Sequence, residues 1–497
     1  MKRYIWLLLY FTLIPFLASS QVNKGRVIDY STLKPIENVA IQVNAKIGFF
    51  TDTEGHFSIR ETKSNKIAFS CIGYETKILT LDELKANNYV VKLKELENSL
   101  EEVVLSNRKL NLEELFVKIN QNISTNFKSD LSKQAVFYRS SNTPRFKKVE
   151  FELDRSSLLN RKKRKEANKS FQDFSAKMKA TTTTIFTDYF TNLYVKTNVS
   201  TQKIKNRTLV KIDSIKGIRV NNGAEEMSIE GIQKHWKQLV LQHLNQDKTY
   251  KVKTGLFKVD DSLSIKNVNS SLEKNKDSLS IHFSKRGIAN TLFKMNFLKS
   301  ESTFNFLNRK YYKHQLIRIS FINEQMTYLV RFSSRKSKAK FKGIMYISAD
   351  DFGITRVDYG YDDGKKGEHL NLRLLLGVKF SENYFKGTIL YKKNAHDVYY
   401  PYYAKETTGR YFYINRSFKF IENSRKKNKV KFGLKVEGNF YNKNEIVVVS
   451  QKQIDNQTYK DVKELKRVPF ISLSDYNASI WSNGKLLLPF NYIEINK

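Results

Sequence analysis

The sequence of 497 residues contains little cysteine and little proline, with one cysteine, Cys71, and six prolines. A lone cysteine cannot form a disulfide within the chain, so the class of small disulfide-stabilised proteins is excluded. Because Cys71 lies in a strand-like pattern, we expect it to be a small core residue.

Known catalytic motifs are also absent from the sequence. The seven histidines include no H-E-x-x-H and no H-x-x-E spacing, so no zinc peptidase site is predicted. No G-x-S-x-G elbow, Walker-type loop or dinucleotide-binding glycine motif is present. Adjacent acids such as Asp350 and Asp351 fall in turns, where two carboxylates seldom converge on one cleft. We therefore expect a protein that is not an enzyme, with no catalytic residue, no cofactor and no metal.

Negative charge is scarce, because 49 acidic residues accompany 87 lysines and arginines, and the formal net charge is +38. Such an excess is typical of proteins that meet a polyanion, although a basic proteome or habitat also produces it. Three basic clusters lie between apolar runs, at Arg161 to Lys169, Arg335 to Lys342 and Arg425 to Lys431. Each is predicted to be a solvated loop or hairpin tip, with a phosphate-binding patch as the alternative. The clusters lack interleaved aromatic residues, so we expect no nucleic acid partner.

Long hydrophobic runs are confined to the start of the chain. Lys2 and Arg3 precede an apolar run from Ile5 to Leu17, and the small residues Ala18 to Ser20 follow it. This order predicts a cleavable signal peptide over residues 1–20, because the run is short for a membrane span. No cysteine follows the run, so a lipoprotein anchor is not expected. We expect export to the periplasm or association with the outer membrane.

The sequence does contain a regular β pattern near its start. Val39, Ile41 and Val43 alternate with polar or small residues, as in a half-buried strand. The turn at Asp52 to Gly55 places an acid first and a glycine where a positive φ is expected. Short strands at regular intervals with turns between them predict a β-sandwich.

The stretch from Gly25 to Val104 resembles the carboxypeptidase-regulatory-like (transthyretin-like) domain of secreted and outer-membrane proteins of the Bacteroidota. The matching segments are Gly25-Arg26-Val27, Pro35, Thr51-Asp52 with Gly55 and Phe57, Ser70 with Ile72-Gly73-Tyr74, and Leu100 to Val104. The resemblance implies a seven-stranded β-sandwich over residues 21–107. It also implies a structural or interaction module without catalytic residues. In the family this module often precedes the plug and barrel of a nutrient receptor, but no plug-like segment follows here.

A helical connector is predicted at residues 108–132. The residues with helical spacing are Leu112, Leu115, Phe116, Ile119 and Ile123. Asn111 suits the N-cap, and Glu113 and Glu114 suit the positive end of the helix dipole. This helix, followed by Phe137-Tyr138-Arg139, resembles the segment after the regulatory-like domain in uncharacterised envelope proteins of the same bacteria.

Residues 133–497 are predicted to form a β-rich antiparallel domain with one helix, at Ile229 to Leu244. Two hairpins are clearest, and further strands follow them. The hairpins are Tyr311 to Phe321 with Gln325 to Phe332, and Lys342 to Ile347 with Ile354 to Tyr361; the later strands are His369 to Phe380, Phe385 to Tyr391, Arg410 to Phe420 and Lys431 to Tyr441.

Two forms of this C-terminal domain remain open: a soluble curved sheet or half-barrel with an apolar concave face, and a small transmembrane barrel. Basic residues on both faces of one strand, such as Lys313 and Arg318, would each cost a barrel roughly 2–4 kcal/mol near the membrane midplane. The final residues, NYIEINK, also lack the terminal aromatic common in barrel insertion signals. The hairpin from Gly343 to Tyr361 resembles hairpins of lipoprotein-carrier-like half-barrels, which favours the soluble form.

Tyrosines are concentrated on one predicted strand region. Tyr400, Tyr402, Tyr411 and Tyr413 are candidate ligand-binding residues, because exposed tyrosines can stack on sugar rings. Alternating tyrosines are also ordinary strand residues, and this structural interpretation is favoured.

Three function classes agree with these observations. The first is a non-enzymatic cell-envelope structural or binding protein, whose β-rich domain binds an amphipathic or anionic envelope ligand. The second is an outer-membrane β-barrel or barrel accessory protein, and the third is a hydrolase without a recognisable motif. The expected partners are an envelope protein, a glycan or an anionic lipid, with peripheral association with the outer membrane.

Overall fold

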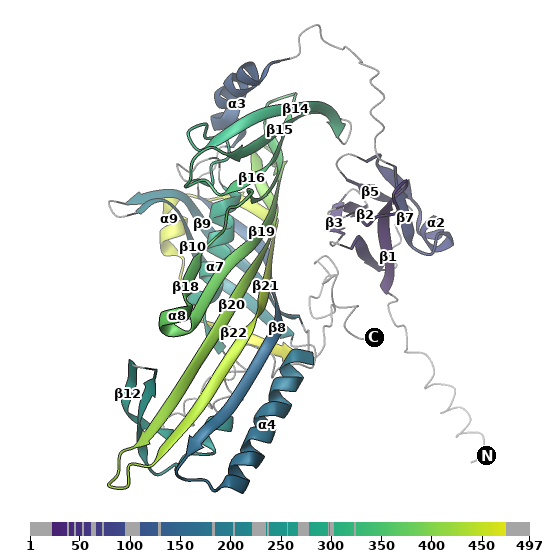
Figure 1. Cartoon of the computed structure of the whole chain (residues 1–497). Helices are drawn as coiled ribbons and strands as arrows, with labels where there is room; N and C mark the ends of the chain where they lie inside the picture. Colours follow the sequence, from purple (N-terminus) through teal and green to yellow (C-terminus); the bar gives the residue numbers. More distant parts are fainter. Residues whose placement is uncertain are drawn as a thin grey trace, which may run out of the picture. The chain divides into compact units, whose positions relative to one another are not determined.

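The computed structural model of the chain is shown in Figure 1. The residues that the structure describes are 22–36, 39–43, 46–51, 54–60, 66–71, 74–94, 110–127, 131–180, 184–201, 204–220, 235, 238–255, 257–266, 278–296, 298, 303–322 and 325–473. The predicted signal peptide, the Gly73 turn and the segment Leu100 to Val104 lie outside the described residues. Residues 22–94 belong to one unit, and residues 110–320 and 325–473 belong to a second.

The first unit contains two small sheets, with strand orders β4-β1-β7 and β3-β2-β5-β6, which together hold the seven strands expected. Its elements are β1 (Val22–Asp29), β2 (Ala40–Val43), β3 (Lys46–Phe50), β4 (His56–Arg60), β5 (Ile67–Ser70), β6 (Lys77–Leu79), α2 (Leu81–Ala86) and β7 (Val90–Leu93). β1 pairs with β7 in parallel, and β1 pairs with β4 in the antiparallel direction.

One hydrophobic core joins these two sheets. Val27 and Phe57 come from the first sheet, Ile41 and Phe69 come from the second, and all four are at most 1% exposed. The Phe57 and Phe69 ring centroids are 5.2 Å apart. Cys71 is half-buried and packs against this core, which agrees with the predicted core role. The alternation seen in the sequence therefore reflects a strand with one buried face.

The glycine predicted to adopt a positive φ does so. Gly55 has φ +75°, a conformation that side chains with a Cβ rarely adopt. A Cβ at this position would also collide with the carbonyl oxygen of Val27, which accepts a hydrogen bond from Ile36 N at 3.0 Å. The turn before β4 thus depends on glycine for two separate reasons.

The second unit begins with α3 (Leu112–Asn126), which confirms that a helix forms in this segment. The Asn111 side chain accepts a hydrogen bond from Glu114 N at 2.9 Å, and the Glu114 carboxylate accepts one from Asn111 N at 3.1 Å. This reciprocal capping box satisfies backbone N–H groups that the first helical turn leaves unpaired. Leu115, Phe116 and Ile119 form its buried stripe.

A 15-stranded, mainly antiparallel sheet makes up most of the second unit (Figure 1). Its strands are β8 (Ser132–Ser156), β9 (Ile185–Thr201), β10 (Ile204–Val220), β11 (Thr249–Thr254), β12 (Phe257–Ser264), β13 (Ser278–Ser280), β14 (Tyr312–Ile322), β15 (Gln325–Ser334), β16 (Phe341–Ser348), β17 (Ile354–Tyr361), β18 (His369–Leu372), β19 (Val378–Lys393), β20 (Tyr399–Glu422), β21 (Lys429–Gln453) and β22 (Arg467–Leu473). The main path is β13-β22-β10-β9-β8-β21-β20-β19-β17-β16-β15-β14. The chain is therefore mainly β, as predicted.

The two predicted hairpins are confirmed as β14 with β15 and β16 with β17. The three later strands are longer than predicted, because β19, β20 and β21 continue beyond the most regular part of their patterns. The single strand predicted from His369 to Phe380 is wrong. The one-turn helix α8 (Arg373–Leu376) interrupts it, and Gly377 ends that helix with φ +64°.

The basic cluster Arg161 to Lys169 is not a loop, because it forms the first half of α4 (Arg161–Ala180). The Asn160 side chain accepts a hydrogen bond from Lys163 N at 2.9 Å, which fits an N-cap. Phe171, Phe174 and Met178 are buried at helical spacing further along, and the helix presents most of its basic residues to solvent. The clusters Arg335 to Lys342 and Arg425 to Lys431 lie largely in connections between strands, as predicted.

Two other helices are seen among the described residues of the second unit. α7 (Ile281–Met295) was not predicted, and α9 (Asn456–Asp461) is a short helix before β22. Of the helix predicted from Ile229 to Leu244, residue 235 and residues 238–244 are described, and residues 238–241 are helical. No helix among the described residues is long and apolar enough to cross a membrane.

One face of the large sheet carries two hydrophobic clusters. Alternate residues of β21 face the same side, and Phe432 and Val436 belong to one cluster while Ile446 and Val448 belong to the other. α4 packs on the first cluster and α7 packs on the second. We call this side the inner face, and the side that carries Glu445 the outer face.

Candidate functional site

A pocket with a volume of about 210 Å³ lies at one end of the large sheet. Its walls come from the start of β8, the end of β21, the β19–β20 hairpin and the C-terminal ends of α3 and α7. Because β8 and β21 are antiparallel, the start of one strand and the end of the other meet at the same end of the sheet. The fold therefore brings residues from five separate segments to this place.

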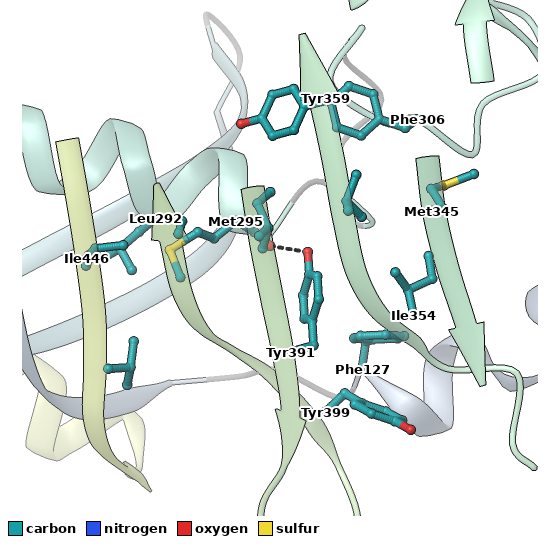
Figure 2. Close-up of a cluster of buried hydrophobic side chains, with 14 of the residues drawn as sticks. Phe127, Leu292, Met295, Phe306, Met345, Ile354, Tyr359, Tyr391, Tyr399 and Ile446 are labelled. Carbon is teal, nitrogen blue, oxygen red and sulfur yellow. Dashed lines mark hydrogen bonds between the residues drawn. The ribbon is translucent and has the colours of Figure 1, made fainter. Parts of the chain in front are cut away.

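The deep wall of the pocket is aromatic. The Phe127 ring, just after α3, stacks on the Tyr399 ring at 5.4 Å and meets the Tyr391 ring edge-on at 5.6 Å. The Tyr391 hydroxyl donates a hydrogen bond to Met295 O at 2.6 Å (Figure 2). Burial raises the pKa of Tyr391 well above its ordinary value, so this phenol stays neutral.

α7 supplies an aliphatic part of the wall through Leu292 and Met295, which are at most 1% exposed. Figure 2 shows both side chains in the same cluster as Ile446 of β21 and the rings of Tyr391 and Phe127. This wall is continuous with the largest hydrophobic core of the second unit, so the fold holds it rigidly.

One polar group in the pocket lacks a hydrogen-bond partner. Gln134 on β8 is 9% exposed, and its Nε2 donates to Ser132 Oγ at 3.1 Å. Its Oε1 is buried and has no hydrogen-bond partner in the structure. A buried acceptor without a donor costs about 1–3 kcal/mol. A donor group on a bound molecule would remove that cost.

Basic side chains line the mouth of the pocket. Lys452 and His396 line it and are exposed, and none of the described lining residues carries a carboxylate. Close to the rim, Lys393 Nζ lies 2.8 Å from Asp351 Oδ2, which lowers the pKa of Asp351 although burial alone would raise it. The lining therefore favours a negative charge at the mouth and apolar groups inside.

The structure separates the four tyrosines predicted as ligand-binding residues. Tyr400 lines the pocket and is half-buried. Tyr402 is close to it in sequence, and its ring centroid lies 5.0 Å from Lys392 Nζ. Tyr411 and Tyr413 lie roughly 37 and 44 Å further along β20 than Tyr400, at about 3.4 Å per residue.

Both of these distant tyrosines have partners on the outer face. The Tyr411 hydroxyl donates to Glu437 Oε1 at 3.0 Å, and the Tyr413 ring centroid lies 4.4 Å from Arg373 Cζ. The pocket thus includes Tyr400 of the predicted group, and glycan binding by these tyrosines stays a prediction. Sequence reasoning missed Gln134, Leu292 and Lys452, because no motif links positions on three different elements.

Two buried ion pairs lie outside the pocket. On the inner face, Glu406 is 4% exposed and accepts hydrogen bonds from Lys294 Nζ and the Tyr359 hydroxyl, both at 2.8 Å. On the outer face, Arg139 donates to both Asp188 oxygens, at 2.7 and 2.6 Å. Neither pair lines the pocket, so neither supplies an acid and a base to a molecule bound there.

Metal-binding geometry is not found in the described part of the chain. No group of three or more histidine, cysteine, aspartate or glutamate side chains there is arranged to hold a metal ion.

Comparison with known proteins bears on the first unit. Residues 23–105 match the family described as CarboxypepD_reg-like domain. The first unit is a CarboxypepD_reg-like domain. The match ends before α3, so it says nothing about the large sheet or its pocket. Comparison with curated proteins gives no match.

Solved structures show only a faint likeness to the chain. A Vibrio parahaemolyticus domain named for outer membrane lipoprotein sorting is 8% identical, covering 70% of this chain and 97% of its own, with a TM-score of 0.24. The Pseudomonas aeruginosa MucA/MucB complex gives 5% identity, 72% and 99% coverage, and a TM-score of 0.15. Similarity this low carries no argument about the large sheet, so the predicted likeness to lipoprotein carriers stays a prediction.

Proposed function

We propose that this protein is a non-enzymatic binding protein of the cell envelope, whose large sheet holds the apolar end of an anionic amphipathic ligand. The observation that carries this proposal is the pocket, which has a buried apolar interior and a mouth with Lys452 and His396. The CarboxypepD_reg-like domain would then serve as the module that docks an envelope protein. Export by the predicted signal peptide is part of the same proposal.

The size of the pocket limits what enters it. Its volume of about 210 Å³ exceeds the roughly 150 Å³ of an engineered cavity that binds benzene, and it is smaller than the roughly 300 Å³ of the smallest typical ligand sites. It therefore suits one ring or a short stretch of acyl chain. The remainder of such a ligand would lie outside, near Lys452.

The buried Gln134 amide favours a ligand whose apolar end carries a hydroxyl group. A hydroxyl both donates and accepts, so it would pair with this amide in either orientation of its oxygen and nitrogen. A hydroxylated acyl chain with an anionic head combines all three properties of the pocket: apolar walls, one buried polar partner and a basic mouth.

Calorimetric titration of the full mature chain with 12-hydroxydodecanoate, whose hydroxyl lies at the apolar end, and with dodecanoate tests the proposal. We expect binding of both, with tighter binding of the hydroxylated acid. Val398→Trp, at a half-buried lining position, should block the pocket, and Val449→Trp on the exposed part of β21 is the matched control. Equal binding by these two variants, or no binding by the wild type, would contradict the proposal.

A charge variant tests the mouth separately. Lys452→Glu should weaken binding of the acid more than binding of the corresponding alcohol, because only the acid has a charged head. Lys419→Glu, at an exposed position on β20, makes the same change in net charge away from the pocket. Equal effects of the two variants would show that the protein's overall charge, and not the mouth, attracts the ligand.

A further inference from the structure

The helix α8 presents leucines to solvent. Leu374 is 100% exposed and Leu375 is 81% exposed, and Leu370 on the preceding strand β18 is 47% exposed. α8 projects at the margin of the second unit in Figure 1. Isolated exposed leucines are ordinary, but two almost fully exposed leucines side by side in one short turn form a small apolar projection.

This turn is held in place by hydrogen bonds. Gly377 N donates to Arg373 O at 3.0 Å, and Asn415 N on β20 donates to Gly377 O at 2.7 Å. Gly377 has φ +64°, and a Cβ there would collide with Asn415 O. The sheet therefore fixes the position of the turn, so the leucines cannot fold back onto the core without breaking these bonds.

Basic side chains lie at the base of the turn. Arg373 Cζ is 4.4 Å from the centroid of the Tyr413 ring, and Lys379 Nζ is 5.6 Å from that of Tyr411. Cation–π contacts of this kind hold a charge over an aromatic face without neutralising it. The projection thus combines an apolar tip with positive charge beneath it, on a chain of net charge +38.

We propose that the α8 turn inserts into the surface of an anionic lipid bilayer. Stable attachment to a membrane usually needs two signals, and an inserted apolar group with a nearby basic patch supplies both. A second copy of the chain or another protein fits less well, because a stable protein interface buries more than about 1,000 Å² with about 20–30 residues on each side. A bilayer needs only the protruding side chains.

Sedimentation of the mature chain with vesicles of equal parts phosphatidylglycerol and phosphatidylethanolamine tests this inference. Leu374→Ser with Leu375→Ser should lower the vesicle partition coefficient by about tenfold for each leucine removed. Leu374→Phe with Leu375→Phe should retain binding, because the apolar tip is kept. Phosphatidylcholine vesicles should bind the wild type more weakly, since they lack the negative headgroup.

Val117→Ser with Val449→Ser is the matched control, because these valines are about half exposed on α3 and β21. Unchanged binding by the α8 serine variant, or no binding of the wild type to anionic vesicles, would overturn the inference. A serine variant that changes the oligomeric state in gel filtration without changing vesicle binding would also overturn it. The inference does not rest on the pocket, so loss of ligand binding through Val398→Trp leaves it unaffected.

Discussion

On β20 and β21, neighbouring residues point to opposite sides of the large sheet, and the two sides bury different chemistry. On the inner face, Ala404 and Ile446 are directly paired across the two strands, and both belong to the hydrophobic cluster that α7 covers. The neighbouring residues Lys405 and Glu445 are directly paired on the outer face. The inner face relies on packing, whereas the outer face relies on matched charge.

The outer pairing extends across four strands as one row. Asp188 pairs with Arg139, Arg139 with Glu445, and Glu445 with Lys405, so the sign of the charge alternates at each step. Burial raises the pKa of Glu445, but Lys443, Lys405 and Arg139 together outweigh burial and hold it below its ordinary value. Opposite charges directly across adjacent strands stabilise a sheet, and like charges destabilise it. The row therefore fixes the register of four strands on the outer face.

The largest effect is expected from breaking this row. Arg139→Met leaves the Asp188 carboxylate, which is 0% exposed, without its bidentate partner. Removing one partner of a buried ion pair costs about 3–5 kcal/mol, so the free energy of unfolding in urea should fall by that amount. Arg139→Met with Asp188→Leu should lie closer to wild type than the single variant does. If Arg139→Met alone were as stable as wild type, the outer face would not depend on matched charge.

A deletion on the inner face should be costly but graded with volume. Ile446 is 0% exposed, so Ile446→Ala should lower the free energy of unfolding by about 2–5 kcal/mol. Ile446→Val removes one methylene and should cost only about 0.5–1.5 kcal/mol in the same urea titration. Equal costs for the two changes would show that this face does not respond to packing volume.

Glu406 is an exception on the inner face, since it is a buried carboxylate among apolar groups. Glu406→Gln keeps the shape but removes the charge that pairs with Lys294, and we expect a loss of about 1–3 kcal/mol. Glu437→Gln on the outer face is the control, because Glu437 is half-buried and bonds to Tyr411, and its loss should stay below about 1 kcal/mol. The reverse ranking would mean that the inner face tolerates an unpaired charge.

The smallest expected effect is a dependence of the free energy of unfolding on pH. Burial lowers the pKa of His314, whose Nε2 lies 2.7 Å from Phe306 O and whose Nδ1 is buried without a partner. The unfolded chain therefore takes up this proton more readily than the folded chain. Stability should be unaffected above the ordinary histidine pKa of about 6.5 and should fall as the pH drops below it.

The control for this pH effect is another histidine. His314→Phe should reduce the loss of stability at acidic pH, as measured by thermal unfolding over a pH series. His369→Gln, at an exposed position, should leave that loss unchanged. If the His314 variant lost as much stability at acidic pH as wild type, the pH dependence would come from other groups.

The sequence predicts well those parts of the fold that depend on local pattern. The Asn111 cap, the hairpin of β16 and β17 and the alternation in β2 each depend on residues close in sequence. α4 was missed because its first half consists of basic residues on a solvent-facing surface, and the apolar stripe begins only near Ala167. α7 was not predicted, although Ile281, Ile288, Leu292 and Met295 are buried at helical spacing.

The pocket could not be predicted in the same way. Its walls join Gln134 and Lys452, which are more than 300 positions apart and are brought together by the antiparallel register of β8 with β21, and Leu292 of α7 packs beside them. Tyr400 was found because aromatic clustering is visible locally. The exposed leucines of α8 could not be predicted either. In the sequence they continue a strand pattern, and only the structure shows that Gly377 ends a helix there.

The pairing of β8 with β21 has a consequence for how the protein is made. Asn442 Nδ2 on β21 donates a hydrogen bond to Ser140 Oγ on β8 across 302 positions of sequence. One edge of the 25-residue strand β8 therefore stays unpaired until most of the chain has been synthesised. Until β21 is made, that open edge would offer unpaired backbone groups to any other extended chain. Contacts this distant in sequence also slow folding. Folding of the second unit should therefore depend on a holding chaperone more strongly than folding of the first unit, whose described strands pair within 94 residues of the start of the chain.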